Sequence, residues 1–64
     1  MVDAPDLTLG AVTVEVWHKG EWRYETTVSN QAHLEHELRR LSGSRARRRL
    51  VQLVDGRQKT WGGQ

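Results

Sequence analysis

The 64-residue chain contains no cysteine, no phenylalanine and only one proline. Without cysteine, neither a disulfide nor a thiolate metal site can stabilise the fold. No apolar run approaches the roughly 18 residues that a membrane-spanning helix needs, and the first residues lack the basic and apolar segments of a secretion signal. These absences predict a cytoplasmic protein that has no membrane partner.

The length limits the chain to one small domain, which excludes a two-domain enzyme, a Rossmann fold and a TIM barrel. Hydrophobic residues make up 36% of the sequence, so the core must be a thin one of valine, leucine, tryptophan and tyrosine. A domain of this size buries only about 60% of the surface that its unfolded chain exposes. Association with a second copy or another partner is therefore the remaining way to add stability.

Charge is divided unequally along the chain. The net charge is +2, but residues 1–38 carry two basic and seven acidic side chains, whereas residues 39–64 carry eight basic and one acidic. Arginine presents a planar donor fork that suits phosphates and carboxylates. The basic half predicts binding to nucleic acid or to an acidic protein surface, and pairing with the chain's own acidic half is the alternative. Six of these residues are closely spaced arginines: Arg39, Arg40, Arg45, Arg47, Arg48 and Arg49.

A first hairpin is predicted on either side of residues 18–20, because valines alternate with other residues before this segment and β-branched and aromatic residues follow it. A two-residue turn of Lys19 and Gly20 pairs Trp17 with Trp22, whereas a three-residue loop pairs Val16 with Trp22. A one-residue slip moves every side chain to the other face, and only the three-residue loop gathers the apolar residues. We therefore predict one face of Val12, Val14, Val16, Trp22 and Tyr24, and an opposite face of Thr13, Glu15, Trp17, Glu21, Arg23, Glu25 and Thr27.

A helix is predicted over residues 31–41. Ser29 and Asn30 are suitable N-caps, because their side-chain oxygens can accept hydrogen bonds from the free amides of the first turn. Three leucines at helical spacing form one narrow stripe, which can cover one face of a small sheet: Leu34, Leu38 and Leu41.

A second hairpin is predicted from two strands, over residues 50–54 and 57–61, on either side of Asp55 and Gly56. This dipeptide favours a type I′ turn, in which both central residues have positive φ. The turn aligns Leu50 with Trp61, and it directs Arg57, Lys59 and Arg48 to one face. Val51 and Leu53 then point to the opposite side.

These elements predict a single α+β domain of β-β-α-β-β order, with one helix on one face of a three- or four-stranded sheet. We assign residues 1–10 to a flexible leader, residues 11–61 to the domain and residues 62–64 to a flexible tail. One helix cannot cover both faces, so the second face is expected to contact a partner or a second copy. Alternatively, Leu7 and Leu9 of the leader fold over it.

Nothing in the sequence predicts an enzyme. There is no cysteine nucleophile or serine elbow, and the glycines are too scattered for a phosphate-binding loop. His33 and Glu37 are spaced like two metal ligands on a helix, but only His18 could be a third. We expect no metal site and no cofactor.

We expect a non-catalytic module that binds DNA or RNA through an arginine-rich loop and strand. The predicted nucleic-acid contacts are Arg45, Arg47, Arg48, Arg49, Arg57 and Lys59. Trp17 and Trp61 are candidates for stacking on an unpaired base, and the predicted interaction face is formed by Trp17, Arg23 and Trp61. The alternative is a protein-interaction module, such as a small inhibitor, adaptor or structural subunit, that acts as a homodimer or on an acidic partner.

The last three residues, Gly62-Gly63-Gln64, are similar to the Gly-Gly-Gln tail of the prokaryotic ubiquitin-like modifier. The element order is also compatible with the β-grasp fold of ubiquitin-like proteins. The resemblance implies a tail glutamine that is deamidated and joined to lysines of target proteins. It covers three residues only, and the rest of this basic, patterned chain departs from that acidic family, so we transfer no functional residues.

Overall fold

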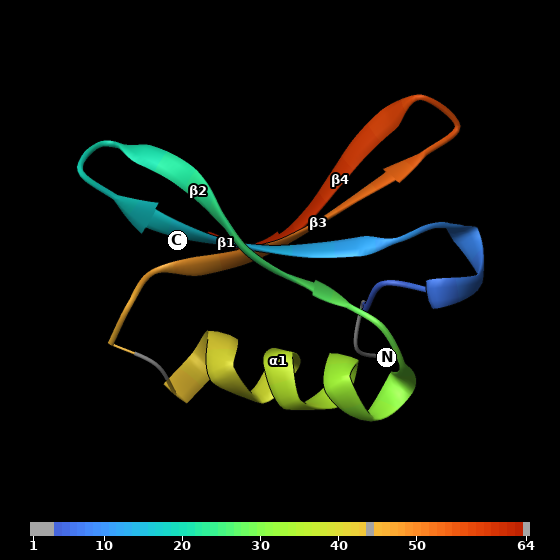
Figure 1. The fold of residues 1–64 in the computed structure, drawn as a ribbon, viewed down its shortest axis with the longest axis horizontal. Coiled ribbons are helices and arrows are strands. Elements are labelled where there is room, and N and C mark those ends of the chain that lie inside the picture. Colours follow the sequence, from blue (N-terminus) through green and yellow to red (C-terminus); the bar gives the residue numbers. More distant parts are fainter. Residues whose placement is uncertain (1–3, 44, 64) are drawn as a thin grey trace.

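The computed structural model describes residues 4–43 and 45–63. A short 3-10 turn, η1 (Leu7–Leu9), precedes the strands β1 (Val12–His18) and β2 (Glu21–Val28), the helix α1 (Gln31–Gly43) and the strands β3 (Arg48–Val54) and β4 (Arg57–Gly62). The strands form one antiparallel sheet of order β2-β1-β3-β4. Figure 1 shows α1 on one side of this sheet. The predicted α+β fold of β-β-α-β-β order is confirmed.

The predicted register of the first hairpin is wrong. Trp17 pairs with Trp22 and His18 with Glu21, so Lys19 and Gly20 form a two-residue turn. Their φ angles are 51° and 84°, and two consecutive positive values match the twist of the flanking strands. A β-bulge shifts the register between Val14 and Glu15.

We predicted the three-residue loop because, without a bulge, the two-residue turn divides the apolar residues between the two faces. The bulge removes this conflict. Glu15 pairs with Tyr24 and Val14 with Thr26, so Glu25 is the extra residue of β2. Beyond the bulge, Val28 lies opposite Val12, and both are buried. Before the bulge, the residues of β2 keep the register of the tight turn. A β-strand with one extra residue can thus have one pairing register before the bulge and another after it.

The second hairpin has the predicted register. Val54 pairs with Arg57, Gln52 with Lys59 and Leu50 with Trp61. Asp55 and Gly56 have φ angles of 51° and 74°, as a type I′ turn requires. β4 extends one residue beyond the prediction, to Gly62.

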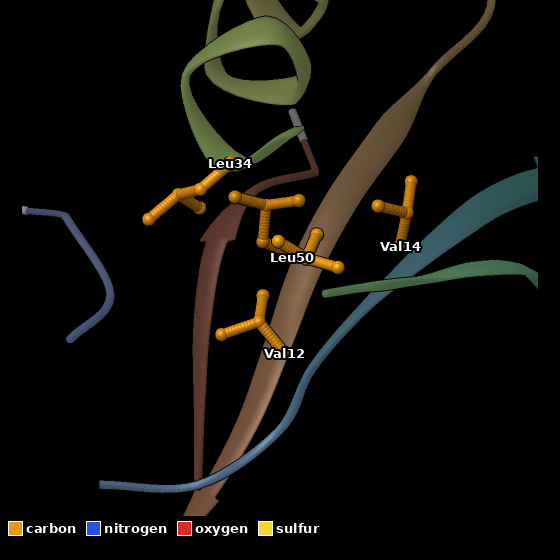
Figure 2. Close-up of a cluster of buried hydrophobic side chains, with 5 residues drawn as sticks. Val12, Val14, Leu34 and Leu50 are labelled. Carbon is orange, nitrogen blue, oxygen red and sulfur yellow. The ribbon is translucent and has the colours of Figure 1, made fainter. Parts of the chain in front are cut away.

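The helix begins where the sequence predicts. The Asn30 side chain caps it, since Oδ1 accepts a 2.8 Å hydrogen bond from the His33 amide. Leu34 is buried, and the other two leucines of the stripe pack against the core at its margin. Figure 2 shows the Leu34 side chain of α1 beside Leu50 of β3, with Val12 and Val14 of β1 around them. Together with Val28, these four residues are the buried members of the hydrophobic core.

Residues 4–10 of the predicted leader lie against the body of the domain. Buried Gln52 of β3 donates hydrogen bonds from Nε2 to the carbonyl oxygens of Asp6 (2.7 Å) and Gly10 (2.9 Å). Leu7 packs against the core, whereas Leu9 stays exposed. This segment therefore lies on the α1 side of the sheet (Figure 1) and leaves the other side uncovered. Residues 1–3 of the leader lie outside the described residues.

Candidate nucleic-acid interface

The uncovered side of the sheet carries two tryptophans in direct contact. Trp17 and Trp22 are cross-strand partners, and directly paired residues point to the same side of a sheet. Their ring centroids are 5.2 Å apart with the planes inclined by 70°, the edge-to-face arrangement that aromatic quadrupoles favour. Trp17 is 39% exposed.

Two arginines lie over these rings. The Arg49 guanidinium is 4.5 Å from the centroid of Trp22, and that of Arg47 is 5.3 Å from Trp17 and 5.8 Å from Trp22. At such distances a cation is attracted by the negative face of the ring. We call these four residues the Trp–Arg cluster: Trp17, Trp22, Arg47 and Arg49.

The two glycines that follow Trp61 hold Arg47 in place. The Gly63 amide donates to the Arg48 carbonyl (3.0 Å), and the Gly63 carbonyl accepts from Nε (3.0 Å) and Nη2 (2.8 Å) of Arg47. Gly62 and Gly63 have φ angles of 83° and 89°. A Cβ on Gly63 would make only an ordinary contact, 3.4 Å, with the Trp22 ring, so glycine is favoured here by its positive φ. Of the predicted tail, only Gln64 lies outside the described residues.

Several arginines pair with the acidic half of the chain. Arg48 is bidentate to Glu25, with Nε 3.1 Å from Oε1, and Arg49 lies 2.7 Å from Glu15. Arg40 lies between Glu25 and Glu37. Hydrogen bonds from Arg48 lower the pKa of the Glu25 carboxyl below its usual range. If these arginines bind a ligand, they must do so while paired with carboxylates of the same chain.

The six predicted nucleic-acid contacts are divided between the two sides of the sheet. Arg47 and Arg49 belong to the Trp–Arg cluster on the uncovered side. Lys59 pairs with Gln52, and Arg48 is opposite Val16, which places both on the α1 side. Arg57 pairs with Val54, so it lies on the α1 side as well. Arg45, in the loop before β3, is exposed and has no ion pair with any carboxylate of residues 4–43 or 45–63, and the same is true of Arg57 and Lys59.

The structure does not bring Trp17, Arg23 and Trp61 together on one face. Arg23 pairs with Val16, so it is on the opposite side of the sheet from Trp17. Trp61 pairs with Leu50 and packs against the core. Trp22 and Tyr24, which we predicted on the apolar face with Val12, Val14 and Val16, instead share the uncovered side with Trp17. The signal for this placement was the two-residue turn at Lys19 and Gly20, which we set aside on grounds of burial.

The uncovered side also exposes apolar surface away from the Trp–Arg cluster. Tyr24 is 66% exposed and Leu53 is 64% exposed. The Tyr24 hydroxyl forms a 2.9 Å hydrogen bond with Thr27 on the same side. This face is therefore not wholly polar, and residues 4–10 do not cover it.

His33 and Glu37, the pair spaced like metal ligands on α1, are hydrogen-bonded to each other. Glu37 is only 3% exposed, and it accepts hydrogen bonds from His33 Nε2 (3.1 Å) and Arg40 Nη1 (2.8 Å). The described part of the chain contains no group of three or more histidine, aspartate or glutamate side chains that could hold a metal ion. It also contains no helix that is long and apolar enough to cross a membrane.

The fold and this surface define a small α+β domain with one open, aromatic and arginine-bearing sheet face. Comparison with known proteins finds no matching family model, no matching curated protein and no matching solved structure.

Proposed function

We propose that the protein is a non-catalytic module that binds single-stranded nucleic acid, DNA or RNA, on the uncovered sheet face. The observation that carries the proposal is the Trp–Arg cluster, in which the exposed Trp17, its half-buried partner Trp22 and two guanidiniums share one side of the sheet. Aromatic rings in a basic setting are the usual means of holding unpaired bases without a sequence motif.

The two kinds of side chain supply different parts of the binding free energy. Stacking of a base on an aromatic side chain contributes about 1–3 kcal/mol, and Trp17 has the exposed ring surface for it. Arginines interact with the phosphates, which makes the affinity depend on salt. Arg45 adds positive charge that no carboxylate of the described residues neutralises, and Arg57 and Lys59 do so from the α1 side of the sheet.

A single strand suits this face better than a duplex. Bases in a duplex are stacked on one another, so their faces are not available to a tryptophan ring. The Trp–Arg cluster offers ring surface and donors side by side, and a splayed strand can use both. We therefore expect tighter binding of an oligothymidine than of a duplex of equal length.

The test compares two single substitutions that remove a guanidinium from opposite sides of the sheet. Arg47→Gln removes a guanidinium from the Trp–Arg cluster, whereas Arg23→Gln removes an exposed guanidinium that pairs with Glu21. Fluorescence anisotropy of a labelled oligothymidine at low and high salt should show weaker binding for Arg47→Gln and unchanged binding for Arg23→Gln. Trp17→Leu should also weaken binding, with folding checked by circular dichroism. Equal affinity of all four proteins, wild type included, would rule out this face.

A second candidate function is a protein interface on the same face, which the exposure of Leu53 and Tyr24 favours. A second copy of the chain is then the expected partner, since a domain this small gains stability by association. Sedimentation velocity would show a dimer that Leu53→Glu converts to a monomer. A monomer at all concentrations, with oligothymidine binding intact, would leave only the first function.

A further inference from the structure

A cavity of about 240 Å³ opens beside the Trp–Arg cluster, where the loop between α1 and β3 meets the end of β4. Residues from three separate parts of the chain line it. Leu41 contributes from the last turn of α1, Gly62 and Gly63 from the end of β4, and three arginines from the loop and the first residue of β3: Arg45, Arg47 and Arg48.

The cavity has an excess of positive charge. The charge of Arg48 is met by Glu25. Arg47 directs Nε and Nη2 to a neutral carbonyl, that of Gly63, so this contact does not neutralise its charge. Arg45 has no carboxylate partner among the described residues, and no acidic side chain of those residues lines the cavity. Two of the arginines that line the cavity, Arg45 and Arg47, therefore carry charges that no carboxylate of the described residues pairs with.

The glycines of the cavity wall lie in close contact with neighbouring backbone. A Cβ on Gly62 would lie 3.1 Å from the Arg48 carbonyl oxygen and 3.3 Å from Leu41. The Gly63 amide is fixed to the same carbonyl. The position of Arg47 is thus set before any ligand arrives, and a preformed site loses less free energy to ordering when it binds.

We propose that this cavity is a phosphate site, which takes one backbone phosphate of the strand whose base stacks on the Trp–Arg cluster. The assignment of this phosphate to a nucleic-acid strand rests on the proposed function. The shared residue is Arg47, which lines the cavity and also lies over the rings of Trp17 and Trp22. In a nucleotide, a single sugar separates phosphate from base, so one nucleotide can occupy both places. Guanidiniums match the geometry of phosphate oxygens.

The first experiment tests the phosphate site without nucleic acid. Inorganic phosphate is titrated into the ¹⁵N-labelled protein, with chloride at equal ionic strength as the reference. The backbone amides of Arg47, Arg48 and Gly63 should shift saturably, and Arg45→Gln should weaken this binding severalfold. Arg57→Gln is the matched control, because it removes an equally exposed arginine outside the cavity. Shifts that are absent, or that Arg45→Gln and Arg57→Gln reduce equally, would overturn the site.

The second experiment tests whether the bound phosphate belongs to a nucleic-acid strand. The slope of log affinity against log salt for oligothymidine should fall by about 1 for Arg45→Gln, and inorganic phosphate should compete with the oligonucleotide. Phosphate that saturates the cavity without competing would overturn the assignment. Trp17→Leu separates the two proposals: it should weaken oligothymidine binding by a larger factor than phosphate binding, because Arg47 keeps its hydrogen bonds to Gly63. If wild-type protein binds phosphate but no oligonucleotide, the proposed function and the strand assignment fail while the anion site remains.

Discussion

Arg49 contacts Glu15 and Trp22 at the same time. Its guanidinium lies 2.7 Å from the Glu15 carboxylate across the β1–β3 pair and 4.5 Å from the Trp22 centroid across β1. Both partners come from the acidic half of the chain, and Arg49 comes from the basic half. The ion pair therefore orients the guanidinium on the ring, but it also places a negative charge at the edge of the proposed nucleic-acid surface.

Glu15→Gln is expected to increase the affinity for oligothymidine. The substitution removes a negative charge beside Arg49 and keeps a side chain of the same size, so the net positive field at the Trp–Arg cluster increases. The lost ion pair is partly exposed and contributes about 0.2–1 kcal/mol to stability. Anisotropy titrations at two salt concentrations measure the first effect and urea unfolding measures the second. Glu21→Gln, whose carboxylate pairs with Arg23, is the control. Reduced affinity of Glu15→Gln would show that the carboxylate serves mainly to position Arg49.

Glu25 is expected to make folding sensitive to acid. Hydrogen bonds from Arg48 lower its pKa in the folded protein below the usual value of 4.5. The unfolded chain then takes up this proton at a higher pH than the folded one. The contribution of Glu25 to stability is present above pH 4.5 and is lost as the pH falls through the lowered folded pKa. Urea midpoints measured from neutral to acid pH should fall less steeply for Glu25→Gln than for wild type. Parallel curves would contradict the prediction.

The second hairpin and the helix could be predicted from local patterns. The Asp55-Gly56 turn needs positive φ at both positions, and alternation then sets every pair of β3 and β4. The cap at Asn30 and the leucine stripe locate α1 in the same way. In each case neighbouring residues carry the physical cause, so no contact distant in sequence was required.

The first hairpin and the Trp–Arg cluster could not be predicted because they depend on non-local features. A bulge at Glu25 has no pattern of its own, and an argument from strict alternation placed Trp22 and Tyr24 in the core. The position of Arg47 depends on Gly63, which is far along the chain and was assigned to a tail. The arginine-rich segment itself was recognisable, but the side of the sheet on which each arginine lies was not.

Leu34 is expected to contribute more to stability than any other residue of α1. It is 1% exposed and is the only apolar residue of the helix that is fully buried among the described residues. Leu34→Ala should destabilise by about 2–5 kcal/mol, because it removes apolar contacts and leaves a cavity. Leu53→Ala, at an exposed position, should change the free energy of unfolding by less than about 0.5 kcal/mol. Urea denaturation compares them, and equal losses would contradict the packing of α1 on the sheet.

Lys19 gives a direct test of the register of the first hairpin. It adopts a φ of 51° in the two-residue turn, a conformation that costs an L-residue about 1–2 kcal/mol and that asparagine tolerates better. Lys19→Asn creates the preferred Asn-Gly sequence of a type I′ turn and should raise the urea midpoint. Lys19→Val should lower it, since a β-branched side chain is poorly accommodated at positive φ. Interstrand nuclear Overhauser effects between Trp17 and Trp22 would report the register in each variant. Contacts between Val16 and Trp22 in their place would restore the three-residue loop and remove the Trp–Arg cluster from the uncovered face.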